Sequence, residues 1–176
     1  MHDDVAYPPR TSVPEWNSTP PSLPLTAAEY SIFRLGAPDG DTATRWSQDL
    51  TDASVAHEII TVDRDALAAW LTTCDEDFER LAATKHVGWR VAAAGEEVGV
   101  LAVAAAARHV GLIEAEVTTF VTSRRRALVY CPHCKAISLV DGGPGERVDC
   151  HGCRRALDVR AHLSRETGAY LGVSAQ

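Results

Sequence analysis

The chain has 176 residues, of which 45% are hydrophobic, and a formal net charge of −7. This length suits one ordinary domain with a small appendage. Charged residues interrupt every apolar stretch before it reaches the eighteen or so residues of a membrane span, which argues against a helical membrane protein. The beginning of the chain does not have the pattern of a secretory signal, and we therefore expect a cytoplasmic protein.

The net charge is divided unevenly along the chain. From Arg124 onward there are nine Lys and Arg against five Asp and Glu, a balance of +4, so −7 minus +4 leaves −11 for residues 1–123. A basic segment can bind nucleic acid through phosphate contacts or dock on an acidic protein surface. It can also simply keep the chain soluble, and charge alone does not separate these interpretations.

Residues 1–25 contain six prolines among Ser, Thr and Asn. Proline lacks an N–H and biases the preceding residue toward extended conformations, so we predict a flexible arm without regular structure. Tyr7 and Trp16 are the two large apolar side chains of this arm. They would anchor it either on a partner or on the body of the chain.

Residues 26–125 have the pattern of an α/β domain. The predicted strands cover residues 30–35, 57–62, 89–94 and 116–122. One predicted helix begins after Asp63, which is placed as its N-cap, and two further predicted helices cover residues 75–83 and 96–110. The last strand, helix and strand form a βαβ unit, which requires parallel strands and a right-handed crossover. The alanine run at residues 104–107 predicts a helix packed closely against a sheet. The pattern as a whole favours a small Rossmann-like layer structure.

The turn after the strand at residues 89–94 is where a dinucleotide-binding domain carries its Gly-rich phosphate loop. This turn has only Gly95, followed by Glu96 and Glu97. Two carboxylates at a helix N-terminus would repel a pyrophosphate. We therefore predict a degenerate α/β domain without a nucleotide site.

Cys74 lies far in sequence from the other four cysteines and directly precedes Asp75, Glu76 and Asp77. Like charge disfavours a thiolate, which argues against a nucleophile at this position. We predict no catalytic residue and no cofactor-binding residue elsewhere in the chain.

The remaining cysteines form two pairs with the same spacing, Cys131 with Cys134 and Cys150 with Cys153. Two such pairs supply the tetrahedral thiolate shell that structural zinc prefers. The alternative, a pair of disulfides, requires an oxidising compartment and a scaffold that depends on such links. The predicted short strands around these pairs cover residues 127–130, 137–140, 147–149 and 157–159. Residues 126–176 are therefore predicted to form a zinc ribbon with a C-terminal docking tail, folded largely by its metal.

Four sulfurs fill every position of a tetrahedral ion and leave none for water or substrate, which indicates a structural metal. Iron in the same shell would be a one-electron carrier, as in rubredoxins, and the sequence does not separate the two ions cleanly. The absence of Gly directly after Cys134 or Cys153 disfavours iron. His133 and His151 are expected to be exposed or to support the ligands, because the cysteine set is complete without them.

The two cysteine pairs, with residues 157–165 and 168–172, resemble the C-terminal domain of the small, DmmA-type subunit of dimethylamine monooxygenase. Residues 86–125 are similar to this family as well, notably at 94–97 and 111–116, whereas the first sixty residues add little. Leu163 stands where the family leads us to expect an aromatic residue, and Glu166 and Thr167 replace a more basic, apolar pair. These departures concern the partner surface and spare the metal ligands.

The resemblance implies a helper subunit of a bacterial complex that oxidises dimethylamine with dioxygen and NADPH, releasing methylamine and formaldehyde. It implies that FMN and a [2Fe-2S] cluster belong to a reductase-like subunit and that haem belongs to another subunit. The chain has no G-x-G-x-x-G, no plant-type cysteine cluster and no clear haem motif, which agrees with a role without an active site of its own. We expect Zn²⁺ in this chain, with Fe as the alternative.

A basic surface is predicted to contact these partners, formed with the tail at residues 168–172 by Arg154, Arg155, Arg160, His162, Arg165 and Tyr170. Three hypotheses stay open: a zinc-bearing assembly subunit, an iron-bearing electron carrier, and a ribbon that binds nucleic acid. The last has only the basic C-terminal half in its favour. The ribbon lacks aromatic faces on which bases stack, and the acidic N-terminal half repels phosphate.

Overall fold

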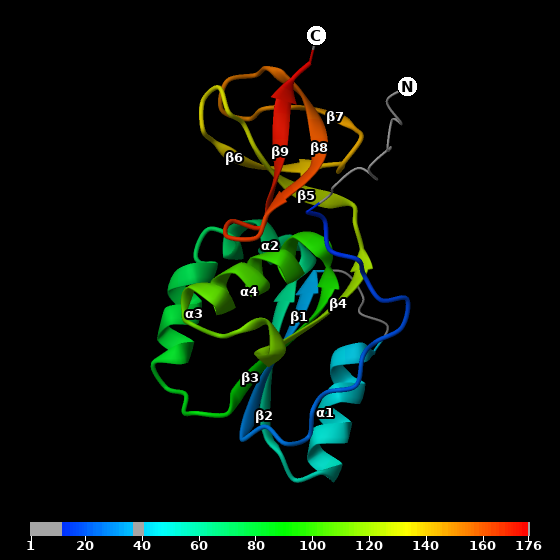
Figure 1. Ribbon diagram of the computed structural model, residues 1–176, viewed down its shortest axis with the longest axis vertical. Helices are drawn as coiled ribbons and strands as arrows, with labels where there is room; N and C mark the ends of the chain where they lie inside the picture. The colour runs from blue at the N-terminus through cyan, green and yellow to red at the C-terminus, as the bar shows by residue number, and fades with distance from the viewer. Residues whose placement is uncertain (1–11, 37–40, 176) are drawn as a thin grey trace, which may run out of the picture.

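The computed structural model describes residues 12–36 and 41–175. It is a mixed α/β structure in which a four-stranded sheet with helices on both faces lies below a five-stranded sheet (Figure 1). This agrees with the predicted α/β class. Tyr7 and the beginning of the predicted arm lie outside the described residues.

The four-stranded sheet, which we call the parallel sheet, has the order β2-β1-β3-β4, and each neighbouring pair is parallel. Its strands and their helices were predicted to within a few residues, except for α1 and the short 3-10 helix η1. In chain order the elements are β1 (Glu29–Gly36), α1 (Thr42–Asp52), β2 (Ala56–Asp63), α2 (Arg64–Trp70), α3 (Cys74–Ala82), β3 (Trp89–Glu96), α4 (Glu97–His109), η1 (Glu114–Glu116) and β4 (Val117–Ser123).

Both faces of the parallel sheet are covered by helices at its centre, which is why β3 contains the unbroken apolar run Val91–Ala94. Successive side chains of a strand point to opposite faces. Phe33 and Leu35 of β1 therefore join the core beneath α2, α3 and α4, whereas Tyr30 and Ile32 join the core beneath α1. Helix α1 buries Ala43, Trp46 and Leu50, whose helical spacing is the sequence signal for this element.

Helix α4 lies between the two sheets and is buried on more than one side. Val98 and Val103 belong to the core of the parallel sheet, while Leu101 belongs to the core of the other sheet. The turn into α4 depends on Gly95, because its φ is 137° and a Cβ there would lie 2.0 Å from the carbonyl oxygen of Leu35. None of the helices in the described part of the chain is both long and apolar enough to cross a membrane.

The five-stranded sheet, which we call the curled sheet, has the order β6-β5-β9-β8-β7. Its edge strands β6 and β7 come into contact, so the sheet curls back on itself. The strand β9, which we did not predict, pairs parallel with β5 and antiparallel with β8 at the centre of the sheet. The strands are β5 (Arg126–Tyr130), β6 (Ile137–Asp141), β7 (Arg147–Asp149), β8 (Ala156–Ser164) and β9 (Ala169–Ser174).

The described part of the predicted arm has no helix or strand up to residue 25, but its side chains attach it to β8 and to α4. The Ser12 hydroxyl accepts a hydrogen bond from the backbone N–H of Leu163 at 2.5 Å. The indole N–H of Trp16 donates to a carboxylate oxygen of Glu97 at 2.7 Å. Trp16 was expected to anchor the arm either on a partner or on the body of the chain, and the structure shows it bound to the body of the chain.

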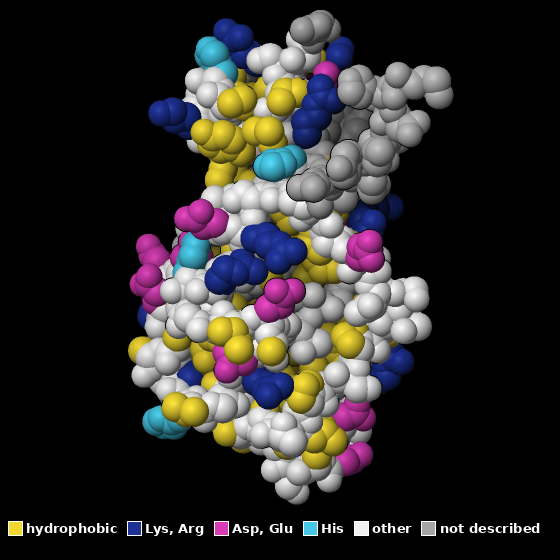
Figure 2. Space-filling model, in the orientation of Figure 1, with side chains coloured by type: hydrophobic (Ala, Val, Ile, Leu, Met, Phe, Trp, Pro, Cys, Tyr) yellow, Lys and Arg dark blue, Asp and Glu magenta, His cyan; other side chains and the backbone are white. Residues whose placement is uncertain are grey.

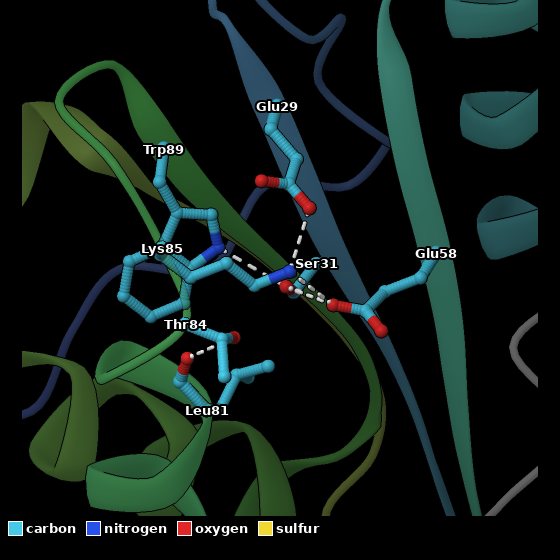
Figure 3. A network of polar contacts seen from close by, with 7 residues as sticks. All are labelled: Glu29, Ser31, Glu58, Leu81, Thr84, Lys85 and Trp89. Carbon is cyan, nitrogen blue, oxygen red and sulfur yellow. Dashed lines mark hydrogen bonds and ion pairs between the residues drawn. The ribbon is translucent and has the colours of Figure 1, made fainter.

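A polar network holds the starts of β1, β2 and β3 together (Figure 3). The ammonium of Lys85 donates to Glu29 of β1 at 2.6 Å and to Glu58 of β2 at 2.7 Å. Glu58 also accepts from the hydroxyl of Ser31, which in turn accepts from the indole N–H of Trp89. Lys85 therefore ties the segment before β3 to two strands of the parallel sheet.

Candidate metal centre

The four cysteines of the predicted metal site lie in two turns of the same construction. Cys131 follows β5 and Cys150 follows β7. In the first turn the N–H of Lys135 donates to the carbonyl of Cys131 at 2.7 Å, and in the second the N–H of Arg154 donates to the carbonyl of Cys150 at 2.9 Å. Each turn therefore aims the two sulfurs of one Cys-x-x-Cys pair at the same point.

The two turns face each other and bring the four sulfurs together. All four Sγ atoms lie within 4.8 Å of one another. The Sγ of Cys131 is 3.8 Å from that of Cys153, and the Sγ of Cys134 is 3.5 Å from that of Cys150. Sulfurs bound tetrahedrally at about 2.3 Å from zinc lie about 3.8 Å apart, whereas disulfide sulfurs lie about 2.05 Å apart. The cysteines are free thiols whose spacing suits a metal ion.

The surroundings shift the pKa values of two of the four cysteines in opposite directions. Hydrogen bonds from the backbone N–H groups of Cys153 and Gly152 outweigh burial and help to lower the pKa of Cys150 to about 6. The N–H of Ala136 acts in the same direction on Cys134, but burial and hydrogen bonds to the other thiols raise the pKa of Cys134 to about 11. Four thiols this close cannot all ionise without a cation among them, so the cluster is suited to one.

The residue after each pair adopts a left-handed conformation. Lys135 has a φ of 63° and Arg154 a φ of 61°, in the region that favours glycine. This chain makes both turns without glycine. The missing glycines therefore do not separate zinc from iron, which weakens our sequence-based reason for disfavouring iron.

The predicted partner residues fall into two groups in the structure. Tyr170 is only 1% exposed and lies in the core of the curled sheet, so its side chain does not belong to the contact surface we predicted. Burial is the main cause that raises the pKa of Tyr170. The charge of Glu97 and a hydrogen bond to Glu97 raise it further. The others lie on the surface: Arg154, Arg155, Arg160, His162 and Arg165.

Glu96 and Glu97, predicted to repel a phosphate, are paired with basic or donor groups. Glu96 is 1% exposed and accepts two hydrogen bonds from Arg126, at 3.0 and 2.6 Å. These bonds are the main reason why the pKa of Arg126 is raised. Glu97 accepts from Trp16 and lies 3.8 Å from the guanidinium of Arg124. These pairs were not apparent from the sequence, and the pair of Glu96 in β3 with Arg126 in β5 joins the two sheets.

Cys74 stands apart from the metal site, as its position in the sequence indicated. It begins α3 and is buried. Burial, with the nearby charges of Asp75 and Asp77, raises the pKa of the Cys74 thiol to about 12. A thiol in this environment is a poor nucleophile at neutral pH.

Comparison with known proteins relates the C-terminal part of the chain to a family. Residues 128–173 match the family described as dimethylamine monooxygenase subunit DmmA-like, C-terminal domain. The chain is 34% identical over 90 residues to the heme-dependent oxidative N-demethylase delta subunit of Ectopseudomonas mendocina (strain ymp). That alignment covers 51% of this chain and 50% of the relative, and no solved structure matches. The predicted resemblance to a DmmA-type subunit is thus confirmed, and residues 128–173 are the part of the chain that matches the family's C-terminal domain.

Proposed function

We propose that this chain is a non-catalytic, zinc-binding subunit of a cytoplasmic, multi-subunit monooxygenase that oxidises dimethylamine with NADPH and dioxygen. In this proposal it helps to assemble a reductase-like subunit, which carries FMN and a [2Fe-2S] cluster, with a haem subunit. The relative named as a delta subunit of a heme-dependent oxidative N-demethylase supports membership of such a complex. The chain spans half the length of that relative, so activity, substrate and partners are part of the proposal.

The observation that carries the structural role is the convergence of four cysteine sulfurs within 4.8 Å of one another. A tetrahedral ion held by these four ligands has no open position for water or substrate. The zinc would fix the turn after β5 to the turn after β7 and so hold the curled sheet closed. It would act on the fold and on the surface that partners meet, and not on the amine.

We further propose that residues 26–125 are a degenerate Rossmann-like domain and that residues 126–176 are a rubredoxin-like zinc ribbon. The parallel order β2-β1-β3-β4 supports the first assignment. In open α/β sheets a ligand binds beyond the carboxyl ends of the strands, where the strand order reverses, here between β1 and β3. The carboxylate of Glu96 lies beside Gly36 at this position and is held by Arg126. A phosphate would have to break this buried pair.

The first alternative is an iron-bearing electron carrier in the same complex. The sulfur geometry suits iron as well as zinc. Its distinguishing feature is a visible thiolate-to-iron absorption that bleaches on reduction.

The second alternative is a nucleic-acid-binding ribbon. It is disfavoured because two arginines at the start of the basic C-terminal half lie against carboxylates of this chain. Arg126 is bound to Glu96, and the guanidinium of Arg124 is turned toward Glu97. Binding to a DNA column that weakens steeply with salt would favour this alternative over ours.

The proposal is tested by reconstituting the complex from the source organism's own haem and reductase subunits, with and without this chain. We expect the chain to co-elute with both subunits and to be required for full formaldehyde release from dimethylamine. Cys134→Ser should lose the metal and lower assembly and turnover, while the haem and flavin spectra of the other subunits stay unchanged. Cys74→Ser is the matched control and should retain the metal. Full assembly and turnover without this chain would overturn the proposal.

A further inference from the structure

A hollow of about 160 Å³ lies where the two sheets meet, along one side of α4. Its lining includes Val117 from β4 of the parallel sheet and Leu163 from β8 of the curled sheet, so both sheets contribute to it. At this waist Figure 2 shows basic and acidic side chains next to apolar ones. We call it the waist groove; its lining residues are Pro14, Trp16, Leu101, Ala104, Arg108, Leu112, Ile113, Glu114, Val117, Thr119, Leu163, Arg165 and Gly168.

The apolar lining of the waist groove continues onto the surface. Ile113, in the segment between α4 and η1, is 62% exposed. An exposed large apolar side chain is ordinary when it stands alone, but here it adjoins an apolar hollow that also contains Leu112 and Val117. A second apolar side chain placed here would remove Ile113 from water.

The charged residues of the waist groove are two arginines and one glutamate. Arg108 donates a hydrogen bond to the backbone carbonyl of Arg165 at 2.5 Å, which keeps both arginines at the same rim. The guanidinium of Arg165 is 3.8 Å from the carboxylate of Glu114, and both side chains are exposed. Such a pair is weak and longer than a hydrogen bond. Because a guanidinium has five N–H donors, this rim suits a further carboxylate.

The chain's own arm forms a wall of the waist groove. Pro14 and Trp16 line it, and the hydrogen bonds of Ser12 and Trp16 hold this part of the arm against the body. Since its walls come from the arm, α4 and β8, the hollow has its shape only when the two sheets are packed together. The lining charges sum to +1, which is too little for the phosphates of a nucleic acid but suits one or two carboxylates of a protein.

We propose that the waist groove binds a segment of a partner subunit in which an apolar side chain is followed by Asp or Glu. This inference rests on the proposed function, because it assumes that the chain belongs to a complex. The apolar side chain would fill the hollow against Ile113, and the carboxylate would meet Arg108 and Arg165. Of these three contact residues the sequence pointed only to Arg165.

The first test measures binding of the haem and reductase subunits by titration calorimetry with the zinc-loaded chain. We expect Ile113→Asp and Arg165→Glu each to weaken binding at least tenfold. Two controls match them in chemistry at exposed sites elsewhere: Val87→Asp in the segment before β3 and Arg45→Glu on α1. Both controls should bind like the wild type. Circular dichroism and zinc content verify that every variant is folded.

The results separate the two ideas. If the wild type binds and Ile113→Asp and Arg165→Glu bind equally well, the waist groove is not the docking site, although the proposed function stands. If the wild type binds neither subunit, the proposed function falls and the inference falls with it. A tenfold loss confined to the two groove variants supports the inference.

A second test does not depend on weakened binding. A photoreactive benzoylphenylalanine placed at Ile113 should crosslink to one partner subunit, and the same group at Val87 should not. Mass spectrometry of the crosslinked peptide should find an apolar residue close to Asp or Glu. A crosslinked segment without carboxylates would overturn the proposed chemistry of the partner.

Discussion

Removing Arg126 should destabilise the protein strongly, because its partner Glu96 is 1% exposed and has no other charged partner in the described structure. Arg126→Met keeps much of the side chain's apolar length but leaves a buried carboxylate uncompensated. Breaking a buried ion pair in this way costs about 3–5 kcal/mol. The side chain of Arg126 is 15% exposed, so water can partly replace it. We therefore expect the free energy of unfolding to fall by an amount near the lower end of this range, about 3 kcal/mol.

Urea titration of the zinc-loaded protein measures this loss as a change in the free energy of unfolding. The double variant Glu96→Leu/Arg126→Met should recover much of the stability, because no buried charge is left. A loss of stability below about 1 kcal/mol would refute the view that this pair is buried and joins the sheets.

Three further predictions concern residues outside the metal site. Burial alone would raise the pKa of Glu58, but hydrogen bonds from Lys85 and Ser31 lower it, so the stability from this contact is present at neutral pH and lost in acid. Lys85→Met should cost about 1–2 kcal/mol at pH 7, since the carboxylates are partly exposed, and urea titration should show this deficit shrinking below about pH 4.5. Trp16→Phe keeps a ring but leaves buried Glu97 without its indole donor, and should cost about 1–3 kcal/mol in the same assay. With the metal chelated at pH 7, iodoacetamide should modify Cys150 before Cys74, as mass spectrometry can show, because the pKa of Cys150 is lowered to about 6 whereas burial raises the pKa of Cys74 to about 12.

Each of these predictions has an outcome that would contradict it. Equal stability of Lys85→Met and wild type at pH 7 would mean that the network in Figure 3 contributes nothing. An unchanged free energy of unfolding for Trp16→Phe would mean that the arm is not held through this hydrogen bond. Modification of Cys74 ahead of Cys150 would contradict its burial.

The construction of each cysteine turn was predictable from the sequence, because the spacing of a Cys-x-x-Cys pair determines a local turn, and the four sulfurs converge as the prediction of a metal site requires. The strands with a clear apolar pattern were predictable for the same reason. The segment at residues 30–35, for example, lies within β1. Helix α1 carried a signal in Ala43, Trp46 and Leu50 that we did not use. In each case the pattern of residues that are neighbours in the sequence determines the local structure.

The contacts between distant parts of the chain were not predictable in this way. Glu96 and Arg126 are 30 residues apart, and Trp16 and Glu97 are 81 apart, so only the fold brings them together. The strand β9 pairs with β5, far away in the sequence, and its tyrosine is therefore buried where we expected an exposed docking tail. The apolar and aromatic content of residues 169–173 was the available signal for a strand.

The most direct test of a structural zinc site is elemental analysis, with a visible spectrum, of the protein purified together with its neighbouring subunits. The analysis should find about one zinc per chain, because four thiolates complete one tetrahedral ion. The chain's own fraction, separated from the haem and flavin subunits, should be colourless. Iron at about one per chain, with a visible absorption that bleaches on reduction, would contradict the structural role and place this chain on the electron path.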